Sequence, residues 1–181
     1  MRKIIQQRKR IYIAVEGEGE QSFIKWLQLL ADQRNLYMHL DCQLLGGGGY
    51  KPMLYKAVRQ RERKDRCKAK SSILLVDSDR DERGDDGWSL SRLKEEANKQ
   101  KITVCAQNPN QEGLLLRMMK APLKPSAGSL TEQLRRRWPD YQKPVNAQTL
   151  ASKFSLDNLL HVAHVDLELE TLLSVIGFSI H

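Results

Sequence analysis

The sequence predicts an α/β fold: a four-stranded, Rossmann-like parallel sheet with helices on both faces, followed by a helical extension. The first observation behind this prediction is that short apolar, β-branched runs alternate with longer segments whose apolar residues recur at helical spacing. The second is that glycines or polar residues bound each apolar run, as is typical of buried parallel strands. The third is size, because 181 residues with 40% hydrophobic content are enough for one domain with an ordinary core.

The strands are expected where the apolar runs lie, at residues 11–15, 40–45, 72–76 and 102–106. Helices are expected to alternate with them, at residues 20–34, 51–66, 88–100 and after Glu112 through Lys120. In the first helix Phe23, Trp26 and Leu30 recur at helical spacing, so this stripe is predicted to face the core. Because crossovers between parallel strands run over the faces of the sheet, the alternation predicts helices on both sides.

The pattern changes after Pro122, Pro125 and Gly128, which break the alternation. Beyond them the chain is expected to be wholly helical, at about residues 129–138, 147–163 and 166–176. We therefore divide the chain into a sheet domain, residues 1–125, and a helical extension, residues 126–181. The extension has too few apolar positions for a core of its own, so we expect it to pack on the sheet domain.

The net charge of +8 is unevenly spread along the chain. Residues 51–70 hold nine basic and two acidic residues, a net of +7, and residues 101–150 hold eight basic and three acidic residues, a net of +5. Such stretches favour a polyanionic partner such as DNA or RNA, although they also serve to keep helix faces soluble. The predicted phosphate contacts are Lys51, Arg59, Arg61, Arg63 and Lys64.

Membrane insertion and secretion are not expected from this sequence. Apolar runs fall short of the roughly 18 residues of a membrane span, and the basic amino terminus lacks the apolar stretch of a secretory signal. The expected location is therefore the cytoplasm. The three cysteines are odd in number and show no metal-binding spacing, which predicts buried free thiols.

Acidic side chains follow two of the predicted strands. Glu16 comes directly after the first strand, and Asp77 and Asp79 come after the third. Because the carboxyl ends of parallel strands meet at one edge of the sheet, we expect these side chains to share a crevice. Clustered carboxylates repel one another unless a cation lies between them, and hard oxygen ligands without Cys or His favour Mg²⁺ or Mn²⁺.

One Glu after the first strand and Asp-x-Asp after the third resemble the Toprim domain, which topoisomerases, bacterial primases and several nucleases share. Two narrower motifs resemble RloB-like Toprim proteins of bacterial defence loci and, more distantly, OLD-type nuclease domains. These motifs are Glu16-Gly-x-x-x-Glu20-x-x-Phe23 and Asn108-Pro-x-x-Glu112-x-Leu-Leu-Leu. The chain departs from the family pattern at Gly19, Gln111 and Arg117, where the family usually carries Thr, an aromatic residue and His.

The resemblance implies metal-dependent hydrolysis of nucleic-acid phosphodiester bonds, in which metal ions activate water and neutralise charge on phosphorus. Asp77 and Asp79 would hold a metal, Glu16 would be a ligand or general base, and Glu112 would complete a second metal site. Asp81 extends the aspartate motif as a further ligand. Glu20 is given an auxiliary role.

Several alternatives stay open. One is a Toprim endoribonuclease that processes rRNA or tRNA, and another is a non-catalytic subunit that binds nucleic acid or protein in a defence complex. Both DNA and RNA stay open as substrates, as does a separately encoded ATPase subunit as partner. A haloacid-dehalogenase-type phosphatase is not favoured, because there the aspartate pair follows the first strand and here it follows the third.

Overall fold

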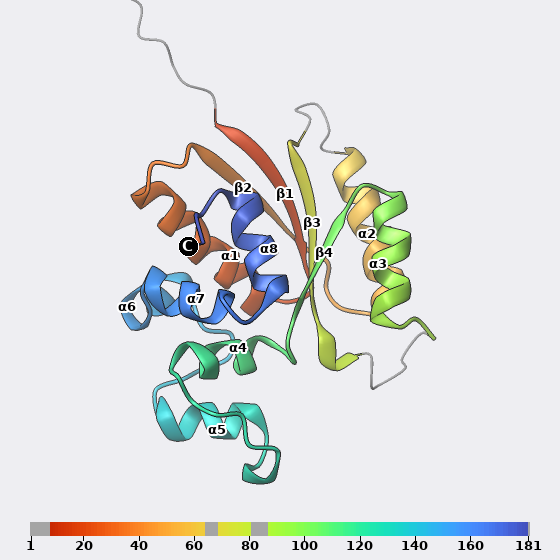
Figure 1. The fold of residues 1–181 in the computed structure, drawn as a ribbon. Helices are drawn as coiled ribbons and strands as arrows, with labels where there is room; N and C mark the ends of the chain where they lie inside the picture. The colour runs from red at the N-terminus through yellow and green to blue at the C-terminus, as the bar shows by residue number, and fades with distance from the viewer. Residues whose placement is uncertain (1–7, 64–68, 81–86, 181) are drawn as a thin grey trace, which may run out of the picture.

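The computed structural model describes residues 8–63, 69–80 and 87–180, so the predicted site residues Lys64 and Asp81 lie outside the described residues. A four-stranded parallel sheet runs through the centre of the molecule in the order β2-β1-β3-β4 (Figure 1). Its strands are β1 (Lys9–Val15), β2 (Met38–Leu44), β3 (Ser71–Asp77) and β4 (Thr103–Gln107). The predicted α/β fold with an all-parallel sheet is therefore confirmed.

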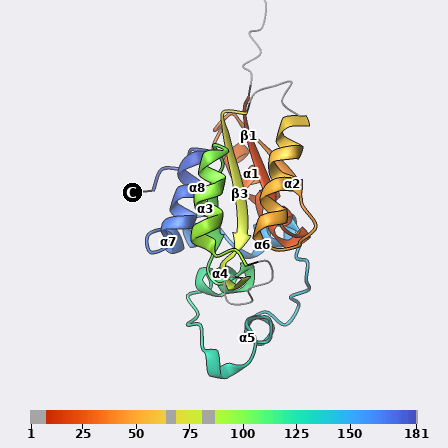
Figure 2. The same cartoon turned by 90° about the vertical axis from the view of Figure 1, so that its right-hand side faces the viewer.

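Helices cover both faces of the sheet, as Figures 1 and 2 show. In the sheet domain they are α1 (Glu18–Gln33), α2 (Tyr50–Arg63), α3 (Leu90–Lys99) and α4 (Gln111–Met118), with a 3₁₀ turn η1 (Ser78–Arg80) after β3. The extension contributes η2 (Pro125–Ala127), α5 (Leu130–Arg137), α6 (Ala147–Lys153), α7 (Leu156–Ala163) and α8 (Leu167–Ile176). Helices α2 and α3 cover one face, whereas α1 and α8 cover the other (Figure 1).

The single helix expected at residues 147–163 is wrong, because the structure divides it into α6 and α7. Phe154 has an extended backbone, with φ −128° and ψ 143°, and its buried ring packs in the core. Ser155 then caps α7, since its hydroxyl accepts a hydrogen bond from the Asn158 backbone N–H. Burial of the Phe154 ring and this cap together end one helix and begin the next.

Alternation along the strands divides the core into two parts. Ile11, Ile13 and Val15 of β1 face the larger cluster, which also holds apolar side chains of α1 and of the extension. Tyr12 and Ala14 face the smaller cluster beneath α2 and α3, where the Tyr12 hydroxyl donates to the carbonyl of Ala57 at 2.9 Å. The extension thus shares its core with the sheet domain, while the boundary at residue 125 stays a prediction.

Helices α4 and α5 lie beyond the carboxyl ends of the strands and not against a face of the sheet, as both ribbon views show (Figures 1 and 2). This is the end at which the motif residues gather. Within the described residues no helix has the length and apolarity to cross a bilayer.

Candidate functional site

The site begins where β3 and β4 end. Asp77 is the last residue of β3 and pairs in register with Gln107, the last residue of β4. Because Leu75 and Cys105 face the larger cluster, strand alternation directs Asp77 and Gln107 to the same side. Gln107 is buried, and neither polar atom of its side chain has a hydrogen-bond partner among the described residues. Two polar side chains therefore lie side by side at the carboxyl ends of two apolar strands.

Three other carboxylates lie close enough to Asp77 for their charges to affect it. Burial raises the pKa of Asp77 to about 8, and the negative charges of Glu20, Asp79 and Glu112 also raise it. Lys143 acts in the opposite direction. The Oδ1 atom of Asp77 is buried and accepts no hydrogen bond from the described residues. A positive charge placed beside this oxygen would stabilise the ionised carboxylate.

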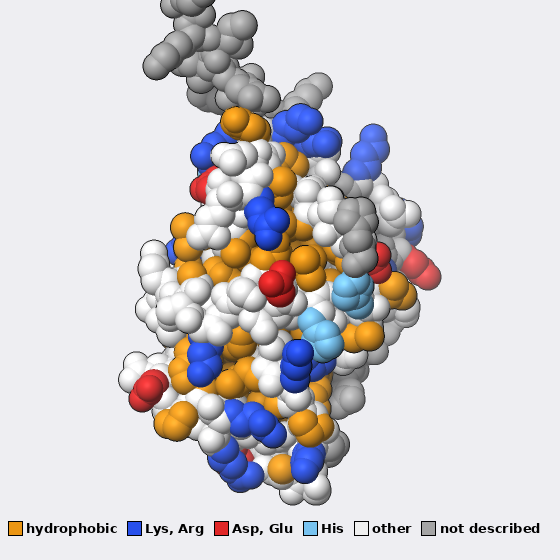
Figure 3. All heavy atoms as spheres, turned by 60° about the vertical axis from the view of Figure 1, so that its left-hand side comes forward, with side chains coloured by type: hydrophobic (Ala, Val, Ile, Leu, Met, Phe, Trp, Pro, Cys, Tyr) orange, Lys and Arg blue, Asp and Glu red, His pale blue; other side chains and the backbone are white. Residues whose placement is uncertain are grey.

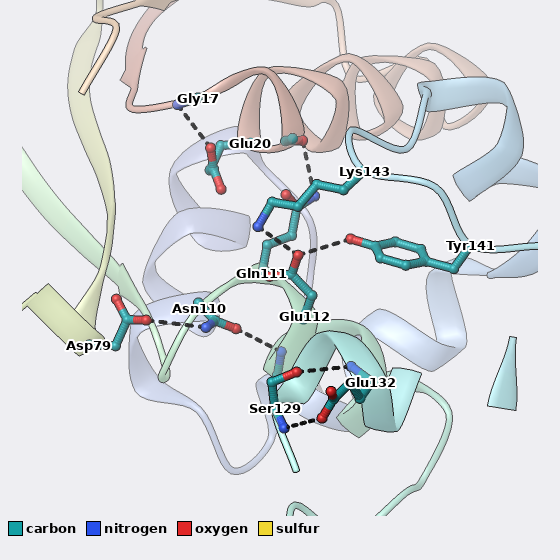
Figure 4. Close-up of polar contacts among 12 residues, drawn as sticks. Gly17, Glu20, Asp79, Asn110, Gln111, Glu112, Ser129, Glu132, Tyr141 and Lys143 are labelled. Carbon is teal, nitrogen blue, oxygen red and sulfur yellow. Dashed lines mark hydrogen bonds and ion pairs between the residues drawn. The ribbon is translucent and has the colours of Figure 1, made fainter. Parts of the chain in front are cut away.

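Glu112, in the first turn of α4, is held by two residues of the extension (Figure 4). Its side chain is only 3% exposed, and its Oε1 atom accepts a 3.0 Å hydrogen bond from the Tyr141 hydroxyl. The same oxygen lies 2.7 Å from Nζ of Lys143, whose side chain is 58% exposed. Burial lowers the pKa of Lys143, but the hydrogen bond and charge of Glu112 outweigh this and raise it. Lys143 is therefore an ammonium cation at the edge of the acidic group.

Asp79 is fixed by the loop that joins β4 to α4. Its backbone N–H donates to the carbonyl of Pro109 at 3.1 Å, and its Oδ2 atom accepts from Nδ2 of Asn110 at 3.2 Å. Asn110 also caps α4, because its Oδ1 atom accepts from the Gly113 backbone N–H. The Asn-Pro motif thus supplies its helix cap from Asn110, whereas Asn108 precedes a cis peptide bond to Pro109 and is exposed.

The amino-terminal ends of α1 and α4 are tied together. The amide of Gln111 donates to the Gly19 carbonyl at 2.9 Å, and a Cβ atom at Gly19 would lie 2.2 Å from the Gln111 Oε1 atom. Glu20 is buried, and its Oε2 atom accepts from the Gly17 backbone N–H at 2.9 Å. This close approach favours glycine at position 19. Glu20 lies on the same side as Glu112 in Figure 4, and its charge acts on Asp77.

Glu16 lies at the end of β1 but is turned to the glycine loop that follows β2. Its Oε1 atom is 3.8 Å from the position that a Cβ atom on Gly47 would take. Among residues 8–63, 69–80 and 87–180, no three His, Cys, Asp or Glu side chains are grouped so as to hold a metal ion. The prediction that Glu16, Asp77, Asp79 and Glu112 ligate Mg²⁺ or Mn²⁺ therefore stays a prediction.

The oxygen donors nevertheless fit such a cation. Asp77 offers a buried carboxylate oxygen without a hydrogen-bond partner, and Asp79 and Glu112 add carboxylates that raise its pKa. No Cys or His side chain is among the groups that act on Asp77, so the donor chemistry favours a hard divalent ion. Binding one ion between these residues requires their side chains to rotate toward one another from the arrangement described.

The basic residues predicted on α2 divide between two ends of the molecule. Lys51 is exposed at the start of α2, close to the carboxyl edge of the sheet, whereas Arg59 and Arg63 are exposed near the end of α2. Arg61 donates to the carbonyl of Gln100 at 2.8 Å and lines an open groove beside the start of β3. Since β3 has 7 residues, the three arginines lie about 20 Å from Asp77 along the sheet.

A scan against protein-family models found no match, and searches of curated proteins and of solved structures found none either. The resemblance to Toprim proteins therefore rests on the motifs and their spacing.

Tyr141, Lys143 and Gln107 are candidate site residues to which the sequence analysis gave no role. The available signal for the first two was a cluster of aromatic and charged residues, Trp138-Pro-Asp-Tyr-Gln-Lys143, at the end of the helix predicted over residues 129–138. Which carboxylate they contact is a long-range property, since Tyr141 lies 29 residues beyond Glu112. For Gln107, a polar residue that ends an apolar strand was the available signal.

Replacing Tyr141 with Phe is expected to lower the free energy of unfolding by about 1 kcal/mol, because one buried hydrogen bond to Glu112 is lost while Lys143 still pairs with it. Urea denaturation in metal-free buffer measures the change. Tyr55→Phe, at a side chain that is 60% exposed, is the control and should leave stability nearly unchanged. Equal effects of the two substitutions would contradict a specific contribution of the Tyr141 hydroxyl.

Proposed function

We propose that this protein is a metal-dependent phosphodiesterase that acts on nucleic acid. The observation that carries the proposal is the state of Asp77, whose pKa is raised to about 8 by burial and by three further carboxylates. Holding Asp77 in its ionised form is costly without a cation, and ligands commonly bind in the crevice beyond the carboxyl ends of parallel strands. Perturbed acids of this kind occur at catalytic sites more often than elsewhere.

The proposed roles follow from the contacts. Asp77, Asp79 and Glu112 would hold Mg²⁺ or Mn²⁺, which when bound supplies a Lewis acid for the phosphate and lowers the pKa of bound water. Asn110 keeps Asp79 oriented, and Tyr141 does the same for Glu112. Lys143, which is partly exposed, would donate hydrogen bonds to a nonbridging phosphate oxygen.

Two further roles rest on the resemblance to RloB-like and OLD-type Toprim proteins. Glu16 would serve as the general base, and Glu20 would support the metal ligands from α1. The same resemblance extends the proposal to bacterial defence in the cytoplasm, with a separately encoded ATPase subunit as a partner. The net charge of +8 supports a polyanionic substrate, either DNA or RNA.

A second candidate function is a non-catalytic subunit that binds nucleic acid. The observation that favours it is the ion pair between Lys143 and Glu112 at 2.7 Å. An ammonium group in this place offsets negative charge without a metal ion. In that case the acidic group would be a structural feature of the interface between the sheet domain and the extension.

Hydrolysis assays separate the two functions. The full chain is incubated with bis(p-nitrophenyl) phosphate and with end-labelled single- and double-stranded DNA and RNA, each with Mg²⁺, Mn²⁺ or EDTA. The hydrolase proposal expects turnover that requires a divalent ion and stops with EDTA. Binding of the labelled strands without turnover under every condition would favour the non-catalytic subunit.

A further inference from the structure

Helix α5 presents three consecutive exposed arginines, Arg135, Arg136 and Arg137, in its last turn. The helix itself is anchored, because Leu134 is fully buried and the amide of Gln133 donates to the carbonyls of Lys124 and Gly128. A capping box between Ser129 and Glu132 fixes its amino-terminal end (Figure 4). The arginines therefore lie on a firmly held helix, where Arg136 also donates to the carbonyl of Ala127 at 3.1 Å.

The segment around α5 is strongly basic and holds few acidic residues. Residues 117–153 contain eight basic and two acidic residues, a net of +6. One of the two acids, Glu132, is engaged in the cap of α5, and the other, Asp140, is exposed. Figure 3 shows Lys and Arg side chains gathered toward the bottom of the molecule, at the height of α5 in Figure 1. Such a surface attracts a polyanion more strongly than a mixed one does.

The surface adjoins the candidate site. Helix α5 packs against α4, whose first turn carries Glu112. The charge of Arg135 reaches the site, since it lowers the pKa of Tyr141, although burial and Glu112 raise that pKa more strongly. Lys143 pairs with Glu112 at 2.7 Å, and its side chain is more than half exposed. In contrast, Arg59, Arg61 and Arg63 are in the last part of α2. Both ribbon views show that this end of α2 lies at the opposite end of the sheet from α5 (Figures 1 and 2).

We propose that Arg135, Arg136 and Arg137 bind the sugar–phosphate backbone of the substrate strand beside the scissile bond. This inference rests on the proposed function and moves the nucleic-acid interface from the end of α2 to the extension. A strand lying along α5 would run beside α4 and bring its phosphates close to Glu112 and to the Lys143 that pairs with it. From the end of α2, a strand would have to cross about 20 Å of the sheet before it reached Asp77.

The test compares R135Q/R136Q/R137Q with R59Q/R61Q/R63Q, two triple variants that each remove three charges. Binding of a fluorescent 20-nucleotide strand to the full chain is followed by anisotropy in EDTA over a range of KCl concentrations. If all three α5 arginines contact phosphates, the slope of log K against log [KCl] should become shallower by about 2–3, since each contact contributes about 0.7–0.9. The α2 variant should keep the wild-type slope, and R135K/R136K/R137K should restore it.

Two outcomes overturn the inference: an unchanged slope in R135Q/R136Q/R137Q, or a shallower slope in the α2 variant alone. Thermal unfolding of both triple variants checks that any loss of binding is not a loss of folding. Turnover of bis(p-nitrophenyl) phosphate by the wild type with Mn²⁺ tests the hydrolase proposal separately. If the diester is hydrolysed but binding does not depend on α5, only the surface assignment fails. If binding depends on α5 but no diester is hydrolysed, the hydrolase proposal fails together with the placement beside a scissile bond, and only the assignment of a nucleic-acid-binding surface stands.

Discussion

Replacing Asp77 with Asn is expected to lower metal-dependent hydrolysis by a factor of at least about 10³, the scale on which loss of a central catalytic group acts. An amide binds a divalent ion more weakly than a carboxylate and carries no charge to balance it. The initial rate of hydrolysis of bis(p-nitrophenyl) phosphate with Mn²⁺ measures the effect. Asp140→Asn, at an exposed position, is the matched control and should retain wild-type turnover. Equal turnover of the two variants would show that Asp77 is not part of the reaction.

The same substitution should have the opposite effect on the metal-free protein. In the folded state the pKa of Asp77 is about 8, whereas an unfolded Asp titrates near about 4. Between these values the unfolded state binds fewer protons than the folded state, so this group's contribution to stability falls as the pH rises through that window. Asn at this position has no charge to bury. We therefore expect Asp77→Asn to be more stable than wild type by about 1–3 kcal/mol near pH 9.

Near pH 5 the folded wild type holds the proton on Asp77, so the difference between the two proteins should be much smaller there. Urea denaturation in EDTA at both pH values measures the difference. A variant that is less stable than wild type at both pH values would mean that Asp77 makes favourable contacts as a carboxylate. That result would remove the electrostatic argument for a cation.

The fold could be predicted because its signals are local. Strands β1, β3 and β4 contain buried apolar runs, and the stripe of Phe23, Trp26 and Leu30 marks the buried face of α1. The break at Phe154 was missed although Ser155 and Asn158 form a recognisable capping box. Apolar periodicity across the break resembles that of one continuous helix, whereas the cap is a local signal that periodicity does not contain.

The candidate site could be predicted only in part. Asp77 and Glu112 follow strand ends, and topology alone brings such residues to one edge. Topology does not determine side-chain direction. Glu20, from the first turn of α1, acts on Asp77, whereas Glu16 turns to the loop at Gly47. Tyr141 and Lys143 reach Glu112 only because the extension folds back onto α4. No local sequence pattern predicts that contact.

Gly19, Gln111 and Arg117, where the chain differs from the motifs it resembles, each make a contact that the structure explains. Gly19 leaves room for the Gln111 amide as it stands, since the Oε1 atom would lie 2.2 Å from a Cβ atom and the amide would have to shift for a larger residue. Arg117 has a partner in Asp166, the N-cap of α8, with 2.7 Å between Nη1 and Oδ2. Each unusual residue thus contacts another part of the same chain, which a comparison of single motifs does not reveal.

A chain cut after residue 125 is expected to lose cooperative folding and to aggregate. The larger core cluster takes many of its fully buried side chains from the extension, including Leu150, Leu159 and Leu173. Their removal would expose the apolar face of α1 and of the sheet to water, at a cost of about 25 cal/mol for each Å². Thermal unfolding followed by circular dichroism, with light scattering as a measure of aggregation, tests this expectation.

The extension also protects the edge of the sheet at β4. Glu168 of α8 accepts a hydrogen bond from the Ala106 backbone N–H at 3.2 Å and pairs with Lys94 of α3. Without α8 this edge strand would be open to pairing with other chains, a known route to aggregation. Within the full chain, Leu173→Ala should cost about 2–5 kcal/mol, whereas Leu167→Ala, at a side chain that is 77% exposed, should cost less than about 0.5 kcal/mol. A truncated chain that stays monomeric and unfolds cooperatively would show that residues 1–125 fold independently, and the shared core would then be an interface between two units.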